Sequence, residues 1–121
     1  MERTNSQKMA LAAYEGIDGR LRRLNEKERD KYTSFAGSFP SLVHACGLAQ
    51  AVAFARAKNH GQYLDDLAAV LRAAGHSEAP SAEALEQVTR EHPVPAYVRL
   101  SRNALRAASW LKRYVEAAEL E

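Results

Sequence analysis

The stretch FPSLVHACGLAQAVAFARAK, residues 39–58, decides the fold class. From Leu42 to Ala57 it contains only one histidine, one glutamine and one arginine as clearly polar side chains. A helix that is apolar on nearly every side is buried inside a protein, and Pro40 is tolerated in a first helical turn. The stretch therefore predicts a buried central helix, with Phe54 in the core.

The whole composition points the same way. Ala (23) and Leu (13) far outnumber Val and Ile (8 together) in the 121 residues, which favours helices and excludes an all-β or doubly wound α/β protein. This length suits a single domain, residues 1–121. The sequence has no run long enough to span a membrane, no secretory signal and a single cysteine, so we expect no disulfide, no multi-cysteine zinc site and a cytoplasmic location.

Apolar periodicity and capping residues predict six helices. In the first, Ala10, Tyr14, Ile17, Leu21 and Leu24 form one apolar stripe, and Asn25 with Glu28 then has the spacing of a capping box. Gly47 lies within the central helix, where it predicts close approach of another helix. Leu, Ile, Val and Phe make up only 24 residues, a thin core that favours packing against neighbouring molecules. The expected helices are residues 5–24, 26–36, 39–58, 61–74, 82–91 and 96–118.

Basic residues are the strongest indication of function. Residues 99–113 contain five bases and no acid, and four of the bases are arginines separated by 3, 4 and 7 positions, which places them on one face of a helix. The arginine fork matches phosphate, so such a stripe can follow a nucleic-acid backbone. Pairing with the acidic faces of residues 61–74 and 82–91, or with a neighbouring copy, is an equally open interpretation. The candidate RNA-binding residues, expected to be exposed, are Arg99, Arg102, Arg106, Lys112 and Arg113, with Arg20, Arg23, Lys31 and Lys58 elsewhere in the chain.

Catalytic constellations are hard to find. Asp65 and Asp66 are adjacent and point about 100° apart on a helix, so they favour a solvated helix start over a shared proton or metal. His44 and Cys46 face different directions on theirs, and we expect Cys46 to be a small buried side chain. The six glycines are dispersed, which excludes a glycine-rich phosphate loop. We therefore expect no catalytic residue, no metal and no cofactor.

A small helical ribonuclease of the HEPN type is the enzyme class to be tested. That class uses an arginine and a histidine separated by four to six residues. Arg56 precedes His60, and Arg72 precedes His76, with only three residues between them in each case. Both pairs fall short of the pattern, so a ribonuclease is disfavoured.

The chain resembles the small subunit of the type III-B CRISPR effectors, the Cmr complex. The resemblance is strongest over residues 31–58 and extends in order over nearly the whole chain, except for the variable loop 75–95. The matching positions are Gln7, Lys31-Tyr32, Phe39-Pro40, Gly47-Leu48, Gln50, Ala53-Phe54, Lys58, Tyr63-Leu64 and Trp110-Leu111-Lys112-Arg113.

The resemblance implies a non-enzymatic, all-helical subunit. In that family, copies stack as a filament beside the guide–target duplex of a crRNA-guided ribonucleoprotein, and basic residues contact the target RNA backbone. Its partners would be the other Cmr subunits, further copies of itself, and the crRNA and target RNA, with no membrane. Four candidates, Lys31, Lys58, Lys112 and Arg113, lie on matched segments. The alternative is a helical protein–protein interaction module with no direct nucleic-acid contact.

Overall fold

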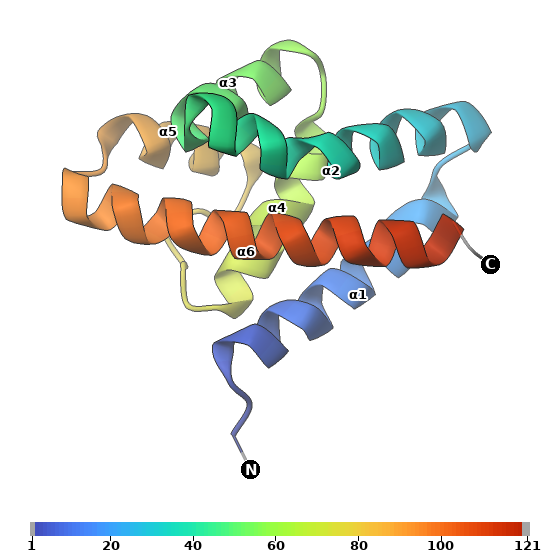
Figure 1. Cartoon of the computed structure of the whole chain (residues 1–121), viewed down its shortest axis with the longest axis horizontal. Helices are drawn as coiled ribbons and strands as arrows, with labels where there is room; N and C mark the ends of the chain where they lie inside the picture. Colours follow the sequence, from blue (N-terminus) through green and yellow to red (C-terminus); the bar gives the residue numbers. More distant parts are fainter. Residues whose placement is uncertain (1, 120–121) are drawn as a thin grey trace.

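Residues 2–119, the part of the chain that this computed structural model describes, fold into six α-helices and contain no strand (Figure 1). The all-α prediction is confirmed. No helix within those residues is long and apolar enough to cross a membrane. The helices are α1 (Asn5–Arg23), α2 (Glu26–Cys46), α3 (Leu48–Ala57), α4 (Gly61–Ala73), α5 (Ala82–Glu91) and α6 (Val94–Glu119).

The predicted capping box at the start of α2 is present, and caps also begin α1 and α5. Asn25 and Glu28 form the expected capping box at the start of α2, with bonds of 2.8 and 3.0 Å, and Thr4 with Gln7 forms another before α1. The Ser81 hydroxyl accepts from the Ala84 amide at the start of α5. These bonds satisfy amide groups that the first turn of a helix leaves without a partner.

Helix α2 is longer than predicted, because it continues through Gly37 and Pro40 to residue 46. The predicted break at these two residues is wrong. Proline in a helix interior costs about 3 kcal/mol, but Phe35, Phe39 and Val43 are spaced at four residues and form one buried face along this part of α2. Packing of that face outweighs the local cost, which the sequence pattern around Gly37 and Pro40 does not show.

The chain breaks instead at Gly47, which has φ 83° and ψ 163° and separates α2 from α3. That region of backbone space is open almost only to glycine. The Tyr97 hydroxyl lies 3.7 Å from the place that a Cβ on Gly47 would occupy, and it accepts a 3.0 Å bond from the Ala49 amide at the start of α3. The glycine is therefore a hinge between two helices and not an interior residue of one.

The break corrects the prediction for Phe54, which is 45% exposed. The buried face of α3 comprises Leu48, Ala51, Val52 and Ala55, and Phe54 points away from it. The central buried helix is α4, in which seven of the 13 residues are buried, including Tyr63, Leu64 and Leu67. One hydrophobic cluster draws on all six helices.

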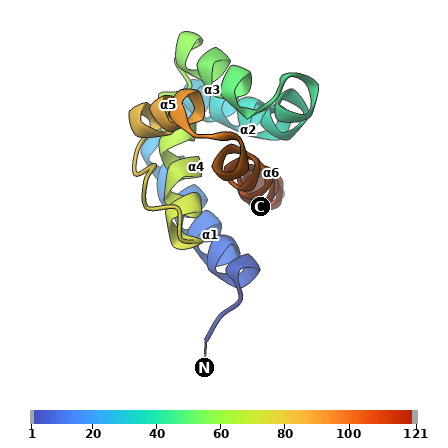
Figure 2. The same ribbon diagram turned by 90° about the vertical axis from the view of Figure 1, so that its left-hand side faces the viewer.

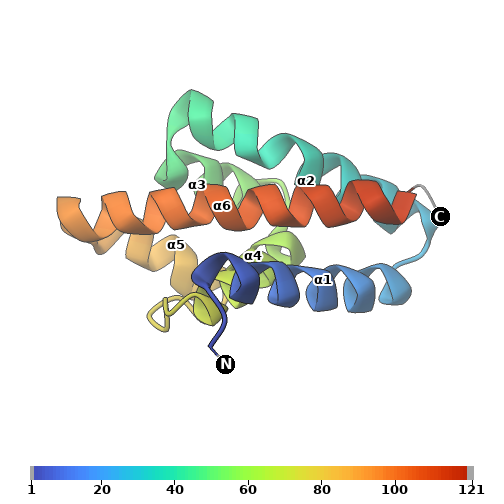
Figure 3. The same cartoon turned by 60° about the horizontal axis from the view of Figure 1, so that its bottom comes forward.

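The longest helix, α6, packs against α1, α2 and α4 and leaves one side open. In Figure 1 it runs across the front of the molecule, and in Figure 2, where it is seen nearly end-on, no other helix covers its outer side. Figure 3 shows α2 and α1 on either side of it. This open side of α6 is where the arginine stripe lies.

Candidate nucleic-acid interface

Four arginines occupy the open side of α6. Arg99, Arg102, Arg106 and Arg113 are all exposed, whereas the opposite side of the helix buries Leu100, Ala104, Ala107, Ala108, Leu111 and Val115. We call these four residues the arginine stripe. It extends over about 21 Å of helix, from a rise of about 1.5 Å per residue. The spacing of 3, 4 and 7 thus places the arginines together on the surface, as predicted.

The arginine stripe carries uncompensated positive charge. Within residues 2–119, none of its members lies within ion-pair distance of a carboxylate. On the acidic helix α5, Glu86 forms ion pairs with Arg56 and Arg90, at 3.4 and 3.9 Å. Pairing of the stripe with acidic faces of the same chain, one of the two alternatives, is therefore wrong, while pairing with a neighbouring copy stays open.

Arg20 does not belong to the interface. Its guanidinium donates from Nε and Nη2 to the Asp66 carboxylate, at 2.9 and 3.0 Å, and its side chain is only 14% exposed. The bond to Asp66 raises the pKa of Arg20 against the opposing effect of burial. The expectation that Arg20 is exposed is wrong, because the sequence spacing of Arg20 and Arg23 does not show which of them faces α4.

Lys112 is only partly exposed, so the expectation that it is largely exposed is also wrong. On α6 it lies about 120° from Arg106, at about 100° per residue. It is therefore on the flank of the helix and outside the arginine stripe.

The remaining candidates are exposed but lie apart from α6. Arg23 lines a shallow depression between α1 and α4, together with Arg72. Lys31 lines a small hollow with Asn59 and His60 at the turn between α3 and α4, and Lys58 ends α3 beside it. The nine candidates therefore do not form one continuous surface.

The two adjacent carboxylates are both bonded. Asp66 is 9% exposed and accepts from the Tyr32 hydroxyl as well as from Arg20. Asp65 accepts a 2.7 Å bond from the Ala82 amide and so caps α5. Burial, then the charge of Asp66 and the bond to it, raise the pKa of Tyr32, and burial raises that of Tyr63. The interpretation of this pair as a solvated helix start is wrong for Asp66, which is buried and joins α4 to α1 and α2, whereas Asp65 is exposed and also bonds the start of α5.

The arginine–histidine pairs are likewise engaged with other residues. His60 stacks on Phe35, with ring centroids 3.7 Å apart, and burial, followed by the Lys31 charge, lowers its pKa. His76 contacts Asn103 at 2.8 Å. Arg56 pairs with Glu86, as described above.

Glu78 is held between two histidines. His76 and His92 both approach its Oε2 atom, at 3.4 and 3.2 Å. The pKa of Glu78 is lowered by hydrogen bonds from the backbone and the two histidines, although burial acts in the opposite direction. Within residues 2–119, no three His, Cys, Asp or Glu side chains are arranged to hold a metal ion.

His44 is exposed, while Cys46 is half-buried and directs its Sγ to the carbonyl of Leu42 at 3.2 Å. The expectation of a buried cysteine is therefore correct only in part.

Sequence reasoning missed a row of aromatic rings beside the arginine stripe. Trp110 and Tyr114 stack one turn apart on α6, and Tyr14 of α1 meets Tyr114 edge-on. Tyr14 belongs to the apolar stripe predicted for the first helix, but it is 56% exposed. The spacing of four between Trp110 and Tyr114 was a usable signal, whereas the contribution of Tyr14 depends on how α1 packs on α6.

Comparisons with known proteins agree on one family. The family model described as CRISPR-associated protein (Cas_Cmr5) matches residues 5–118. A protein named CRISPR system Cmr subunit Cmr5, from Thermus thermophilus, is 36% identical over 119 residues, which are 95% of this chain and 96% of that protein. The crystal structure of a CRISPR-associated Cmr5 family protein from the same organism superposes with a TM-score of 0.81, at 36% identity, over 95% of this chain and 97% of the other. The resemblance inferred from the sequence is confirmed, and the chain belongs to the Cas_Cmr5 family of CRISPR-associated proteins.

Proposed function

We propose that the chain is the non-catalytic small subunit of a crRNA-guided type III-B (Cmr) effector complex, in which copies stack as a filament beside the guide–target duplex. The arginine stripe contacts the backbone of the target RNA. Family membership supports the first part, since the relative from Thermus thermophilus is named as a Cmr subunit. The observation that carries the RNA contact is the row of four exposed arginines that have no acidic partner within residues 2–119.

The stripe suits phosphates better than base edges. Its guanidinium groups lie along one straight helix face, and contacts of this kind hold a nucleic acid in place without reading its sequence. Counterions released from the RNA drive such binding, so the affinity falls steeply with salt. We therefore expect no sequence preference from the stripe.

Stacking of copies is supported by what the surface leaves exposed. Phe54 on α3, with Val94 and Val98 at the start of α6, are 45%, 74% and 45% exposed. Glu83 and Glu91 on α5 are exposed acids that can face a basic surface of the next copy. These exposed apolar and acidic side chains are available for contact with a neighbouring copy.

The absence of catalysis is proposed from the use of each candidate group. Two of the groups that could act as acid or base are engaged in contacts that join helices, Asp66 with Arg20 and His60 with Phe35. A general base needs a free, positioned partner at the reacting proton. The proposal also implies a cytoplasmic location, where the RNA partners and the other subunits would be found.

The test is a charge reversal on the stripe, Arg102→Glu with Arg106→Glu, in the complex reconstituted from all subunits. Binding of target RNA is measured across a range of salt concentrations, and incorporation of the variant is followed by sedimentation. We expect normal incorporation, weaker RNA binding and a salt slope lower by roughly one unit for each contact removed. The matched control is Lys27→Glu with Arg72→Glu, which makes the same charge change at exposed positions on α2 and α4.

The alternative function, a protein–protein interaction module with no RNA contact, is favoured by the exposed Phe54, Val94 and Val98. It predicts a different result for the same variant. If the stripe meets an acidic surface of another subunit, the double substitution prevents incorporation and RNA binding falls only as a consequence. Normal incorporation with unchanged RNA binding removes the stripe from the interface.

A further inference from the structure

Three aromatic rings form a continuous row between α6 and α1. Trp110 and Tyr114 are stacked, with centroids 5.9 Å apart and an interplanar angle of 17°. Tyr14 stands at 75° to Tyr114, with centroids 5.6 Å apart. In such an edge-to-face pair, one ring presents its edge to the face of the other. Tyr14 is also 56% exposed, so the row ends in aromatic surface that is open to solvent.

The aromatic row borders the arginine stripe. Arg106 and Trp110 are one turn apart on α6 and line the same small hollow, and Arg113 is followed directly by Tyr114. On a helix with about 100° per residue, Trp110 lies about 40° from Arg106 and Tyr114 about 80° from it. Cationic side chains along one line of α6 thus have aromatic rings immediately beside them, on the side that faces α1.

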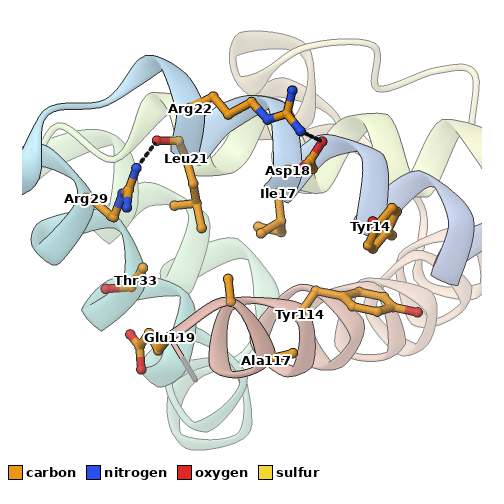
Figure 4. A pocket seen from close by; sticks show the side chains of 11 residues that line it. Tyr14, Ile17, Asp18, Leu21, Arg22, Arg29, Thr33, Tyr114, Ala117 and Glu119 are labelled. Atoms are coloured by element: carbon orange, nitrogen blue, oxygen red, sulfur yellow. Dashed lines mark hydrogen bonds and ion pairs between the residues drawn. The ribbon is translucent and has the colours of Figure 1, made fainter. Parts of the chain in front are cut away.

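Two rings of the row, Tyr14 and Tyr114, also line a groove between α1, α2 and α6, with a volume of about 460 Å³ (Figure 4). This volume lies within the range of about 300–1,000 Å³ that is usual for small-ligand sites. Tyr14 and Tyr114 stand at one end of the groove, and Ile17, Leu21 and Ala117 add apolar surface to its lining. A flat aromatic group can therefore lie against rings while its edges reach the rest of the groove.

Charges within the groove balance each other. Arg22 pairs with Asp18 at 3.2 Å, and Arg29 donates to the Leu21 carbonyl at 2.7 Å, while Glu119 lies opposite. The excess positive charge near this site is that of the arginine stripe. A ligand that fits both features carries regularly spaced negative charges joined to flat aromatic groups, which is the chemistry of single-stranded nucleic acid.

We propose that the row of Trp110, Tyr114 and Tyr14 is a stacking site for an unpaired nucleobase, whose strand lies with its phosphates on the arginine stripe. This inference rests on the proposed function, because it names the form in which that RNA is bound. The base points from the strand toward the side of α6 that faces α1, and it stacks on the exposed ring of Tyr14 at the end of the groove. Every base has a π-face, so the site accepts any unpaired base and does not accept a base that is held inside a duplex.

The experiment compares two oligomers of equal length and charge. One is a single-stranded oligouridine RNA, and the other is an abasic ribose-phosphate strand. Both are titrated, at fixed and at rising salt, against the full chain and against the complex reconstituted with its partner subunits. Trp110 is the only tryptophan of the chain, so in the free chain its fluorescence reports on changes in the row that it forms with Tyr114 and Tyr14.

Three variants separate stacking from other contributions. Tyr14→Ala removes the exposed ring, and Tyr14→Phe keeps it. Leu11→Ala removes an exposed apolar side chain one turn before Tyr14 on α1. All replaced positions are 41–56% exposed, so the fold is expected to tolerate each change.

Wild-type protein should bind oligouridine more tightly than the abasic strand, with quenching of Trp110 fluorescence by oligouridine alone. Tyr14→Ala should weaken oligouridine binding about 5- to 10-fold, the lower part of the range for stacking of one base on one ring, with an unchanged salt slope. It should leave the abasic strand unaffected. Tyr14→Phe and Leu11→Ala should behave as wild type.

The failures are distinguishable. Equal affinity for the two strands, with no effect of Tyr14→Ala, overturns base stacking and leaves the phosphate contact standing. Absence of RNA binding in the complex, or no response to charge reversal of the stripe, overturns the proposed function and this inference together. Failure of Tyr14→Ala to enter the complex assigns the aromatic row to a contact between subunits and also overturns the inference.

Discussion

Replacing Arg20 by alanine is expected to lower the stability of the folded protein and to have no direct effect on RNA binding. The substitution removes two hydrogen bonds, of 2.9 and 3.0 Å, from the Asp66 carboxylate. Asp66 would then keep only the Tyr32 hydroxyl as a partner while it stays 9% exposed. An unpaired carboxylate in such surroundings has lost most of its hydration without a compensating charge.

The size of the effect follows from the burial of the pair. Removing one partner of a buried ion pair costs about 3–5 kcal/mol. The two side chains keep 14% and 11% of their exposure, so we expect the lower end, about 3 kcal/mol. A chain of 121 residues has a total unfolding free energy of roughly 6–18 kcal/mol. The loss is therefore a large part of the stability, and the melting temperature should fall by roughly 10 °C.

Urea unfolding at neutral pH, followed by circular dichroism, measures this loss as a lower midpoint with an unchanged slope. Arg23→Ala is the matched control, because Arg23 is exposed on the same helix and should change the unfolding free energy by less than about 0.5 kcal/mol. Adding Asp66→Asn to Arg20→Ala removes the unpaired charge, so the two effects should not add, with a coupling of about 0.5–3 kcal/mol. An unchanged midpoint for Arg20→Ala, together with weaker RNA binding, would refute the reasoning and return Arg20 to the interface.

Three further substitutions test the fold. Phe54→Ala should lower the free energy of unfolding by less than about 1 kcal/mol, because Phe54 is 45% exposed. Phe39→Ala, at a fully buried position, should lower it by about 3–5 kcal/mol. Equal losses in thermal unfolding would contradict the packing of α3. Gly47→Ala should lower the free energy of unfolding in urea by about 1–3 kcal/mol, since alanine is strained at φ 83° and ψ 163°. An unchanged free energy would mean that the residue between α2 and α3 adopts another conformation. The pKa of His60 is lowered in the folded protein. As the pH drops through 6.5, His60 of the unfolded chain therefore takes up a proton while His60 of the folded chain stays neutral. The free energy of unfolding falls over this range, until His60 of the folded chain is protonated as well. His60→Asn should flatten this part of the dependence of the urea midpoint on pH, and a variant with the wild-type slope would show that His60 is not its source.

Local features of the fold were readable from the sequence because neighbouring residues create them. The capping boxes and the start of α5 depend on side chains three residues from the amide groups that they bond, so spacing alone reveals them. The arginine stripe is equally local, because a spacing of three and four places side chains on one face of any helix. The resemblance to the Cmr small subunit was carried by residues whose order in the chain is itself the signal.

Positions that depend on distant partners were not readable in this way. Gly37 and Pro40 have the local chemistry of a helix boundary, but packing of Phe35, Phe39 and Val43 carries α2 through both of them. The true break at Gly47 is supported from α6, where the Tyr97 hydroxyl bonds the Ala49 amide. The two residues are 48 positions apart in the sequence, so no short pattern could connect them.

The same division applies to the surface. The sequence by itself determined that the protein is helical, that it carries a line of arginines near its C-terminus and that it belongs with the small subunits of Cmr complexes. Only the tertiary structure decided that Arg20 faces Asp66 on α4, 46 residues away, and that Tyr14 meets Tyr114 at the edge of the stripe. The physical reason is that helical spacing shows which residues share a face, whereas the neighbour of that face is chosen by how the helices pack.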